Sequence, residues 1–137
     1  MNKIVLFTAL TAATLLAGCQ APTGPFAPQD TTKYTLENTE KFVLMDAAVQ
    51  TSVTCTGLQQ RTAADGRLEV VANVKNREAR RIQVQIACVF KDAQGFSTGD
   101  ETPFRTVTLE GDATEAVRFT SANAAAKQFT LRVRLAR

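Results

Sequence analysis

Apolar and polar side chains alternate along much of the second half of the chain. The clearest run spans residues 80–91, where every second position is apolar: Ile82, Val84, Ile86, Cys88 and Phe90. A period of two places successive side chains on opposite faces of a strand. This run is therefore predicted to be a half-buried antiparallel strand with its apolar face toward a core.

The same alternation predicts strands on both sides of this run. It is clear at residues 68–74 and 129–135, and weaker at residues 42–46, 49–58, 104–109 and 115–120. Turn-forming pairs such as Asp-Gly at residues 65–66 and Gly-Asp at residues 111–112 separate the runs. Six or seven short strands at this spacing predict an all-β fold over residues 41–137, an immunoglobulin-like antiparallel β-sandwich. Arg132 and Arg134 fall on the outer face of the last strand and are expected to be solvated.

Residues 1–18 lack this alternation and have the organisation of a secretory signal. Lys3 supplies positive charge, residues 4–16 are apolar, and the small residues Ala17 and Gly18 end the run. The run is shorter than the ~20 residues that a membrane-spanning helix needs. We therefore expect residues 1–18 to be a signal peptide that is removed on export.

Cys19 follows this segment directly. Residues 15–19, Leu-Leu-Ala-Gly-Cys, resemble the lipobox of bacterial lipoproteins, in which the cysteine thiol receives diacylglycerol and the new N-terminus is acylated, typically with palmitate. The resemblance implies attachment to a membrane through lipid on Cys19; an ordinary signal peptide that happens to end before a cysteine is the alternative. Gln20 stands where an aspartate would favour the inner membrane, which implies the outer membrane, on its inner leaflet facing the periplasm.

Residues 19–40 are predicted to be the lipidated cysteine and a tether. Pro22, Gly24, Pro25 and Pro28 disfavour regular structure in this stretch. About a dozen residues in an extended form would hold the domain up to ~35–40 Å from the membrane. The tether would allow the domain to reach a partner, although a plain linker explains the composition equally well.

The chemistry of most enzymes is missing from the sequence. There is no histidine, which removes the commonest general base and the usual zinc ligand, and the carboxylates are dispersed. We therefore expect a non-enzymatic protein with no catalytic residues, no metal and no cofactor. The net charge of +3 comes from scattered basic residues without an aromatic-and-basic face, so nucleic acid is not expected as a partner.

Cys55 and Cys88 leave two interpretations open. Both fall on the apolar side of their predicted strands, and export favours oxidation. If each lies in the latter half of its strand, a disulfide between the sheets would stabilise the fold by ~3–4 kcal/mol through loop closure. The alternative is two free thiols that pack as small apolar groups.

Residues 94–103 are the predicted interaction loop. This segment carries Gln94, an isolated Phe96, and the adjacent acids Asp100 and Glu101. Binding residues concentrate on loops that a rigid scaffold holds in place. The alternative is a polar connection between strands without a binding role.

Several short motifs resemble the YcfL-like family of small bacterial lipoproteins. They are Asn-Arg-Glu at residues 76–78, Phe-Lys-Asp-Ala-Gln-Gly at residues 90–95, Pro103, Arg-Thr-Val-Thr-Leu at residues 105–109, Ser-Ala-Asn at residues 121–123 and Leu-Arg-Val at residues 131–133. The resemblance covers about residues 42–135 and implies a periplasm-facing β-sandwich lipoprotein. It supplies no catalytic residues, and this chain departs from the family in Cys55, Cys88 and its sparse aromatic residues.

Two functions follow from these observations. The favoured one is a membrane-anchored, non-catalytic binding or assembly module that docks to another protein of the cell envelope. The alternative is a small-ligand or glycan-binding lipoprotein that uses residues 94–103. Sugar binding is disfavoured because the chain has no tryptophan and one tyrosine for stacking.

Overall fold

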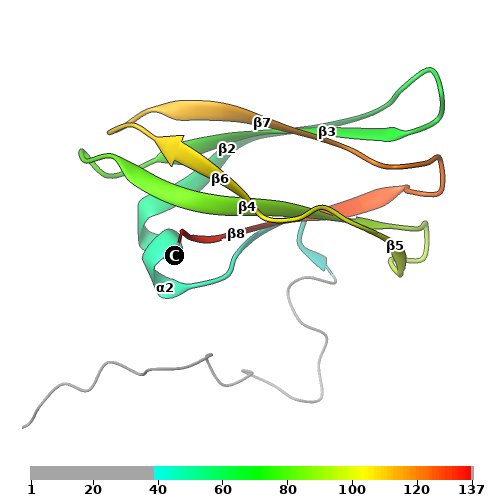
Figure 1. Ribbon diagram of the computed structural model, residues 1–137, viewed down its shortest axis with the longest axis horizontal. Helices are drawn as coiled ribbons and strands as arrows, with labels where there is room; N and C mark the ends of the chain where they lie inside the picture. Colours follow the sequence, from blue (N-terminus) through cyan, green and yellow to red (C-terminus); the bar gives the residue numbers. More distant parts are fainter. Residues whose placement is uncertain (1–38, 137) are drawn as a thin grey trace, which may run out of the picture. The chain divides into compact units, whose positions relative to one another are not determined.

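In the computed structural model, which describes residues 39–136, the chain forms two β-sheets packed face to face (Figure 1). One sheet contains β1 (Phe42–Leu44), β4 (Ile82–Lys91), β5 (Ser97–Glu101), β6 (Arg105–Leu109) and β8 (Gln128–Leu135). The other contains β2 (Val53–Thr62), β3 (Leu68–Asn76) and β7 (Thr114–Thr120), and a short helix, α2 (Ala47–Ser52), precedes β2. The predicted all-β sandwich is confirmed.

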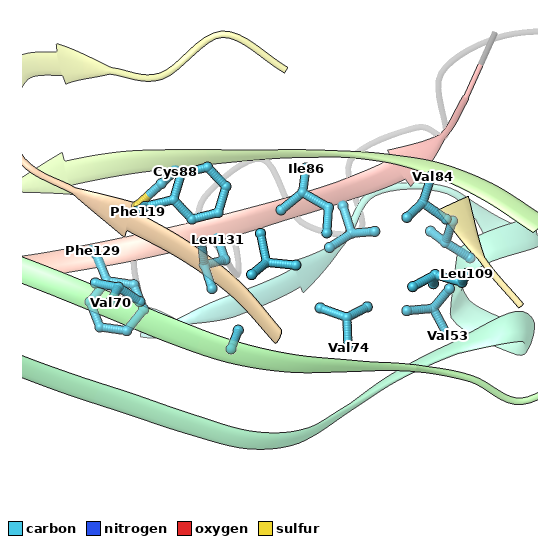
Figure 2. Packing of buried hydrophobic residues seen from close by; sticks show 14 of the residues in the cluster. Val53, Val70, Val74, Val84, Ile86, Cys88, Leu109, Phe119, Phe129 and Leu131 are labelled. Carbon is cyan, nitrogen blue, oxygen red and sulfur yellow. The ribbon is translucent and has the colours of Figure 1, made fainter. Parts of the chain in front are cut away.

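The core lies between the two sheets and is built by the predicted alternation (Figure 2). On β4 the inward side chains of Val84, Ile86, Cys88 and Phe90 are each at most 1% exposed. Side chains of the three-stranded sheet close the core from the opposite side, among them Val70, Val74 and Phe119. Full burial of a valine- or leucine-sized side chain contributes roughly 1.5–3 kcal/mol, so these interleaved faces are the main source of stability.

The chain crosses between the two sheets four times within the described residues, after β1, β3, β6 and β7. The consecutive strands β3 and β4 lie in different sheets, and so do β7 and β8. Within the sheets β3 pairs with β7 and β4 pairs with β8, both antiparallel. Each sheet therefore joins an early strand to a late one, and neither sheet can form from one half of the chain alone.

The strand β1 departs from the predicted antiparallel arrangement. It pairs with β8 in parallel, with Phe42 opposite Leu131 and Leu44 opposite Val133. A parallel pair needs a long connection, and here the rest of the domain supplies it. The sandwich is thus antiparallel except at this edge.

The predicted strand over residues 49–58 is wrong in its first part, where α2 forms. Asp46 caps the helix, because its Oδ1 accepts a hydrogen bond from the amide of Val49 at 2.9 Å. Val49 and Val53 are four residues apart, a spacing that suits one face of a helix as well as one face of a strand. Both side chains are buried, so the apolar pattern did not distinguish the two structures.

The segment predicted as a loop at residues 94–103 contains the extra strand β5. It pairs with β4, placing Ser97 opposite Lys91 and Glu101 opposite Val89, with an irregularity in the register between them. The sequence Ser-Thr-Gly-Asp-Glu contains no apolar residue, so this edge strand has no hydrophobic alternation to reveal it. The prediction that the whole of residues 94–103 is a loop is therefore wrong.

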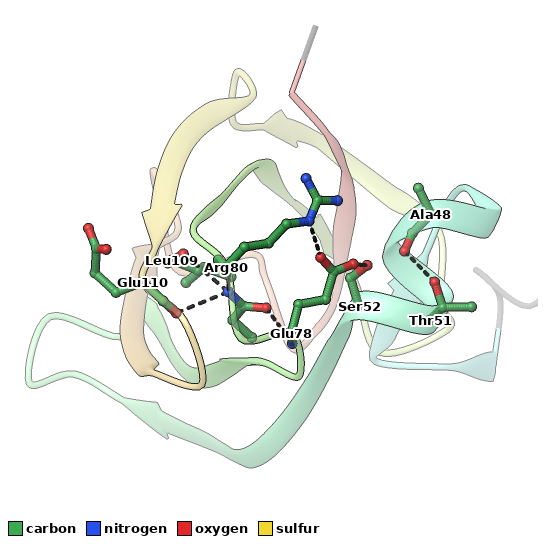
Figure 3. A network of polar contacts seen from close by, with 8 residues as sticks. Ala48, Thr51, Ser52, Glu78, Arg80, Leu109 and Glu110 are labelled. Atoms are coloured by element: carbon green, nitrogen blue, oxygen red, sulfur yellow. Dashed lines mark hydrogen bonds and ion pairs between the residues drawn. The ribbon is translucent and has the colours of Figure 1, made fainter.

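One end of the sandwich is organised around the buried side chain of Asn76 (Figure 3). Its amide nitrogen donates to the carbonyl oxygens of Arg80, Leu109 and Glu110 at 2.7, 3.2 and 3.0 Å. Its side-chain oxygen accepts from the amide of Glu78 at 2.8 Å. Asn76 thereby ties the connection between β3 and β4 to the turn between β6 and β7.

The groups around Asn76 hold the two connections close together. A Cβ atom added at Gly111 would lie 2.0 Å from the carbonyl oxygen of Ala79, so a side chain does not fit there. The carboxylate of Glu78 accepts hydrogen bonds from Ser52 of α2 and from Arg80, both at 2.5 Å. These two bonds lower the pKa of Glu78 below its usual range. The helix is therefore attached to the same connection that Asn76 organises.

We expect Asn76→Ala to lower the free energy of unfolding by about 3–5 kcal/mol. The substitution leaves three carbonyl groups and one amide without their partner, and each buried unsatisfied group costs ~1–3 kcal/mol. Urea unfolding followed by circular dichroism measures the change. The matched control is Asn73→Ala on the exposed side of β3, which is expected to change stability by less than about 1 kcal/mol. Equal effects of the two substitutions would contradict the role of Asn76.

Candidate functional site

The turn between β4 and β5 holds Phe96 out into solvent. The ring is 72% exposed, more than any other large apolar side chain described. Asp92 fixes the turn, since its Oδ1 accepts from the amides of Gln94 and Phe96 at 2.9 and 3.0 Å and its own amide donates to the carbonyl of Phe96. Gly95 has a φ of 87°, a conformation that favours glycine. An aromatic ring on a turn with this many internal bonds is a candidate contact for a partner.

Asp100 and Glu101 do not join this tip. The Oδ2 of Asp100 accepts a hydrogen bond from the amide of Ala122 at 2.6 Å, and Glu101 forms an ion pair with Arg132. Both acids are thus engaged with other parts of the sandwich. Of the four residues predicted to form an interaction loop, the structure places Gln94 and Phe96 together at the tip and separates the two acids from them. Their role in binding stays a prediction.

An arginine–aromatic cluster, formed by Arg132, Arg134 and Phe104, lies on the outer face of the five-stranded sheet. The guanidinium carbons of Arg132 and Arg134 lie 5.6 and 3.7 Å from the centroid of the Phe104 ring. The side chain of Arg132 is 16% exposed, so the expectation that it is fully solvated is wrong. Stacking of this kind holds a guanidinium in place and favours its positive charge.

Strand register explains why the arginine–aromatic cluster forms. Arg132 of β8 is opposite Ala87 of β4, and Arg105 of β6 is opposite Ile86. The residue before β6, Phe104, therefore reaches the same level of the sheet as Ala87. Because alanine is small, the ring and the guanidinium meet above it, which accounts for the complete burial of Ala87 on an outer face.

The polar contacts of the arginine–aromatic cluster leave it short of negative charge. Arg132 pairs with Glu101, and Arg134 donates from Nε to the side-chain oxygen of Gln85 at 2.9 Å. The Nε atom of Arg132 is buried without a hydrogen-bond partner. Of the two guanidinium groups, that of Arg132 is paired with a carboxylate and that of Arg134 with a neutral amide.

Both cysteines are free thiols in the structure, so the disulfide is not formed. Because α2 occupies residues 47–52, Cys55 lies near the start of β2, opposite Val74, and donates weakly to the carbonyl of Gly57. Cys88 lies in the second half of β4 and belongs to the core cluster, and Figure 2 shows it well separated from Val74. The premise that each cysteine lies in the latter half of its strand was wrong for Cys55.

Burial makes both thiols poor nucleophiles. It raises the pKa of the Cys88 thiol to about 12, with the nearby Asp100 adding to the effect. Burial also raises the pKa of Cys55, and a hydrogen bond with the backbone of Gly57 partly offsets the increase. Since the thiolate is the reactive form, neither group is activated for chemistry.

Metal-binding clusters and membrane-spanning helices are both absent from residues 39–136. No group of three or more histidine, cysteine, aspartate or glutamate side chains in this range could hold a metal ion. None of the helices in the same range has the length and apolarity needed to cross a membrane. The predicted signal peptide, Cys19 and Gln20 lie outside the described residues.

A family model described as a protein of unknown function, DUF1425, matches residues 40–135. The chain belongs to this family. The crystal structure of Campylobacter jejuni cj0090 is similar, with a TM-score of 0.60 and 18% identity over 70% of this chain and 98% of that one. A DUF1425 family member from Shewanella sp. pv-4 has a TM-score of 0.57 and 23% identity over 62% of this chain and 79% of that one. These likenesses support the sandwich fold, and no curated protein matches the chain.

The free thiols of this DUF1425 chain give a direct test. Alkylation of the unfolded protein without reductant is expected to label both Cys55 and Cys88, as read by mass spectrometry of their peptides. In the folded protein at pH 8, Cys88 is expected to stay unlabelled because it is buried with a raised pKa. A pair of unlabelled, mutually bridged peptides from the unfolded protein would contradict the free-thiol structure.

Proposed function

We propose that this DUF1425 protein is a lipid-anchored lipoprotein facing the periplasm, and that it acts as a non-catalytic binding or assembly module of the cell envelope. Within the family, the motifs at residues 76–78 and 90–95 favour a relation to the YcfL-like lipoproteins. The partner is another envelope protein that the sandwich contacts through the turn between β4 and β5.

The observation that carries the proposal is the exposed ring of Phe96. A fixed turn holds this ring 72% exposed, at a position where the core gains nothing from it. Aromatic side chains are enriched at the centres of protein interfaces, where burying a ring recovers the cost of its exposure. A ring on an ordered turn also loses little freedom on binding. Docking of a protein surface onto this tip accounts for both features.

The proposed location is supported by the beginning of the sequence. The signal-like residues 1–18 and the lipobox resemblance at Cys19 favour export followed by lipid attachment, and Gln20 favours the outer membrane. More than one acyl chain on Cys19 would make the attachment stable, at ~0.8 kcal/mol per buried CH₂ group. A domain held in this way meets other envelope proteins at high local concentration.

Lipid attachment is tested by Cys19→Ser. The substitution is expected to abolish incorporation of an alkyne-tagged palmitate and to move the protein out of the membrane fraction, because serine offers no thiol for alkylation. Cys55→Ser is the matched control and is expected to remain labelled. Labelling that survives in Cys19→Ser, or that is missing from the unchanged protein, would rule out the anchor.

Docking through the turn is tested by placing a photo-crosslinking amino acid at position 96 in cells. We expect discrete crosslinked species that are not formed from position 59, since Gln59 is exposed on the other sheet. Phe96→Ser, with a crosslinker at position 94, is expected to reduce the yield of the same species several-fold because the buried ring is lost. Failure to trap any specific protein from position 96, or identical species from both positions, would argue against this docking surface.

A further inference from the structure

We propose that the arginine–aromatic cluster binds a carboxylate of an acidic, extended peptide segment on the docking partner. The inference rests on the proposed function, because it names the chemistry by which a partner is recognised next to the turn between β4 and β5. Both arginines lie on β8, on the outer face of the five-stranded sheet.

Arg132 and Arg134 have more N–H donors than there are acceptors bonded to them in the structure. The Nε of Arg134 donates a hydrogen bond to Gln85, and the face of its guanidinium group stacks on the Phe104 ring. These contacts leave both terminal nitrogens available to an incoming acceptor. Arg132 is paired with Glu101, yet its Nε is buried without a partner. A guanidinium presents its N–H groups as a planar fork that matches the two oxygens of a carboxylate.

Charge on this face favours an anion. Glu101 neutralises one of the two guanidinium groups, and the neighbouring outward positions of β4 and β6 carry the neutral side chains Gln83, Gln85, Thr106 and Thr108. An incoming carboxylate would therefore meet an uncompensated positive charge beside neutral hydrogen-bonding groups. Stacking on Phe104 fixes the guanidinium groups beforehand, which reduces the ordering cost of binding.

Two observations favour a peptide carboxylate among the anions. Glu101, the acid that already pairs with Arg132, is itself a carboxylate on an extended strand, so the site accepts that geometry within this chain. The amide and hydroxyl groups of Gln83 and Thr108, which contact each other at 3.4 Å, can also bond to a peptide backbone. Phe104, one residue of the cluster, ends the continuous segment that begins at Phe96 and includes β5, so one extended partner surface can contact both.

The test uses the full-length protein in detergent micelles and a fluorescein-labelled hexapeptide of alternating aspartate and glycine. Fluorescence anisotropy is expected to show binding that weakens with added salt, while the asparagine–glycine hexapeptide does not bind. Arg134→Gln is expected to weaken binding about tenfold, because a charge-assisted, forked contact is lost. The matched control is Arg81→Gln, which removes an exposed arginine paired with Glu110, and it is expected to leave binding unchanged.

Two further variants keep the test decisive if Arg134→Gln alters the fold, as judged by circular dichroism. Arg134→Lys keeps the charge and loses the fork, and Phe104→Leu keeps both charges and loses the stacking platform. Each is expected to weaken binding of the aspartate peptide several-fold. Equal binding by the unchanged protein and by these variants would overturn the proposal.

The other sources of negative charge are separate arms of the experiment. Inorganic phosphate or phosphatidylglycerol vesicles could bind more tightly than the peptide. If Arg134→Gln abolished that binding, the site would be assigned to phosphate groups and the proposal of a peptide ligand would be overturned. Absence of peptide binding would overturn it as well. A crosslinked partner at position 96 whose yield is unchanged in Arg134→Gln would leave the proposed function standing and remove this inference alone.

Discussion

The side-chain amide of Asn76 joins the connection that follows β3 to a turn 33 and 34 residues further along the chain, and the sandwich depends on this joint. The first connection carries the chain from β3 in one sheet to β4 in the other. The second carries it from β6 back to β7, so these two crossings meet at one buried side chain. Gly111 allows the two backbones to approach closely, and Glu78 extends the same polar network to α2. Because a buried amide with all its partners in place has one acceptable geometry, this joint fixes where β4 begins.

The position of β4 in turn determines what appears on the outer face of its sheet. Its register with β8 places Ala87 opposite Arg132, and its register with β6 brings Phe104 to the same level. A shift of one residue would move every side chain of the strand to the opposite face and bury the polar side chains of Gln83 and Gln85. The same apolar alternation that builds the core therefore also sets the spacing of the arginines on the surface.

The core-forming strands could be predicted from sequence, whereas the edges and the cross-strand contacts could not. The strands β3, β4 and β8 have strict alternation because they are central and have one buried face. The helix α2 was missed because Val49 and Val53 fit either period, and β5 because it has no apolar residue. Phe96 could be singled out as a lone aromatic in a polar segment. The stacking of Phe104 on Arg132 depends on register across an intervening strand, which a single sequence does not contain. The missed helix α2 also misplaced Cys55 within its strand relative to Cys88.

The parallel pairing of β1 with β8 has a mechanical consequence. The backbone bonds from Leu131 to Lys41 and from Met45 to Val133, both 2.8 Å, bracket β1 at its two ends. A pull along β1 from the N-terminal side loads these bonds together in shear, whereas a hairpin pulled apart at its end loses its bonds one after another. The pairing of β1 with β8 therefore resists a pull on the N-terminal side of the sandwich. A load that arrives through residue 41 is passed to β8, inside the sheet, through all of these bonds at once.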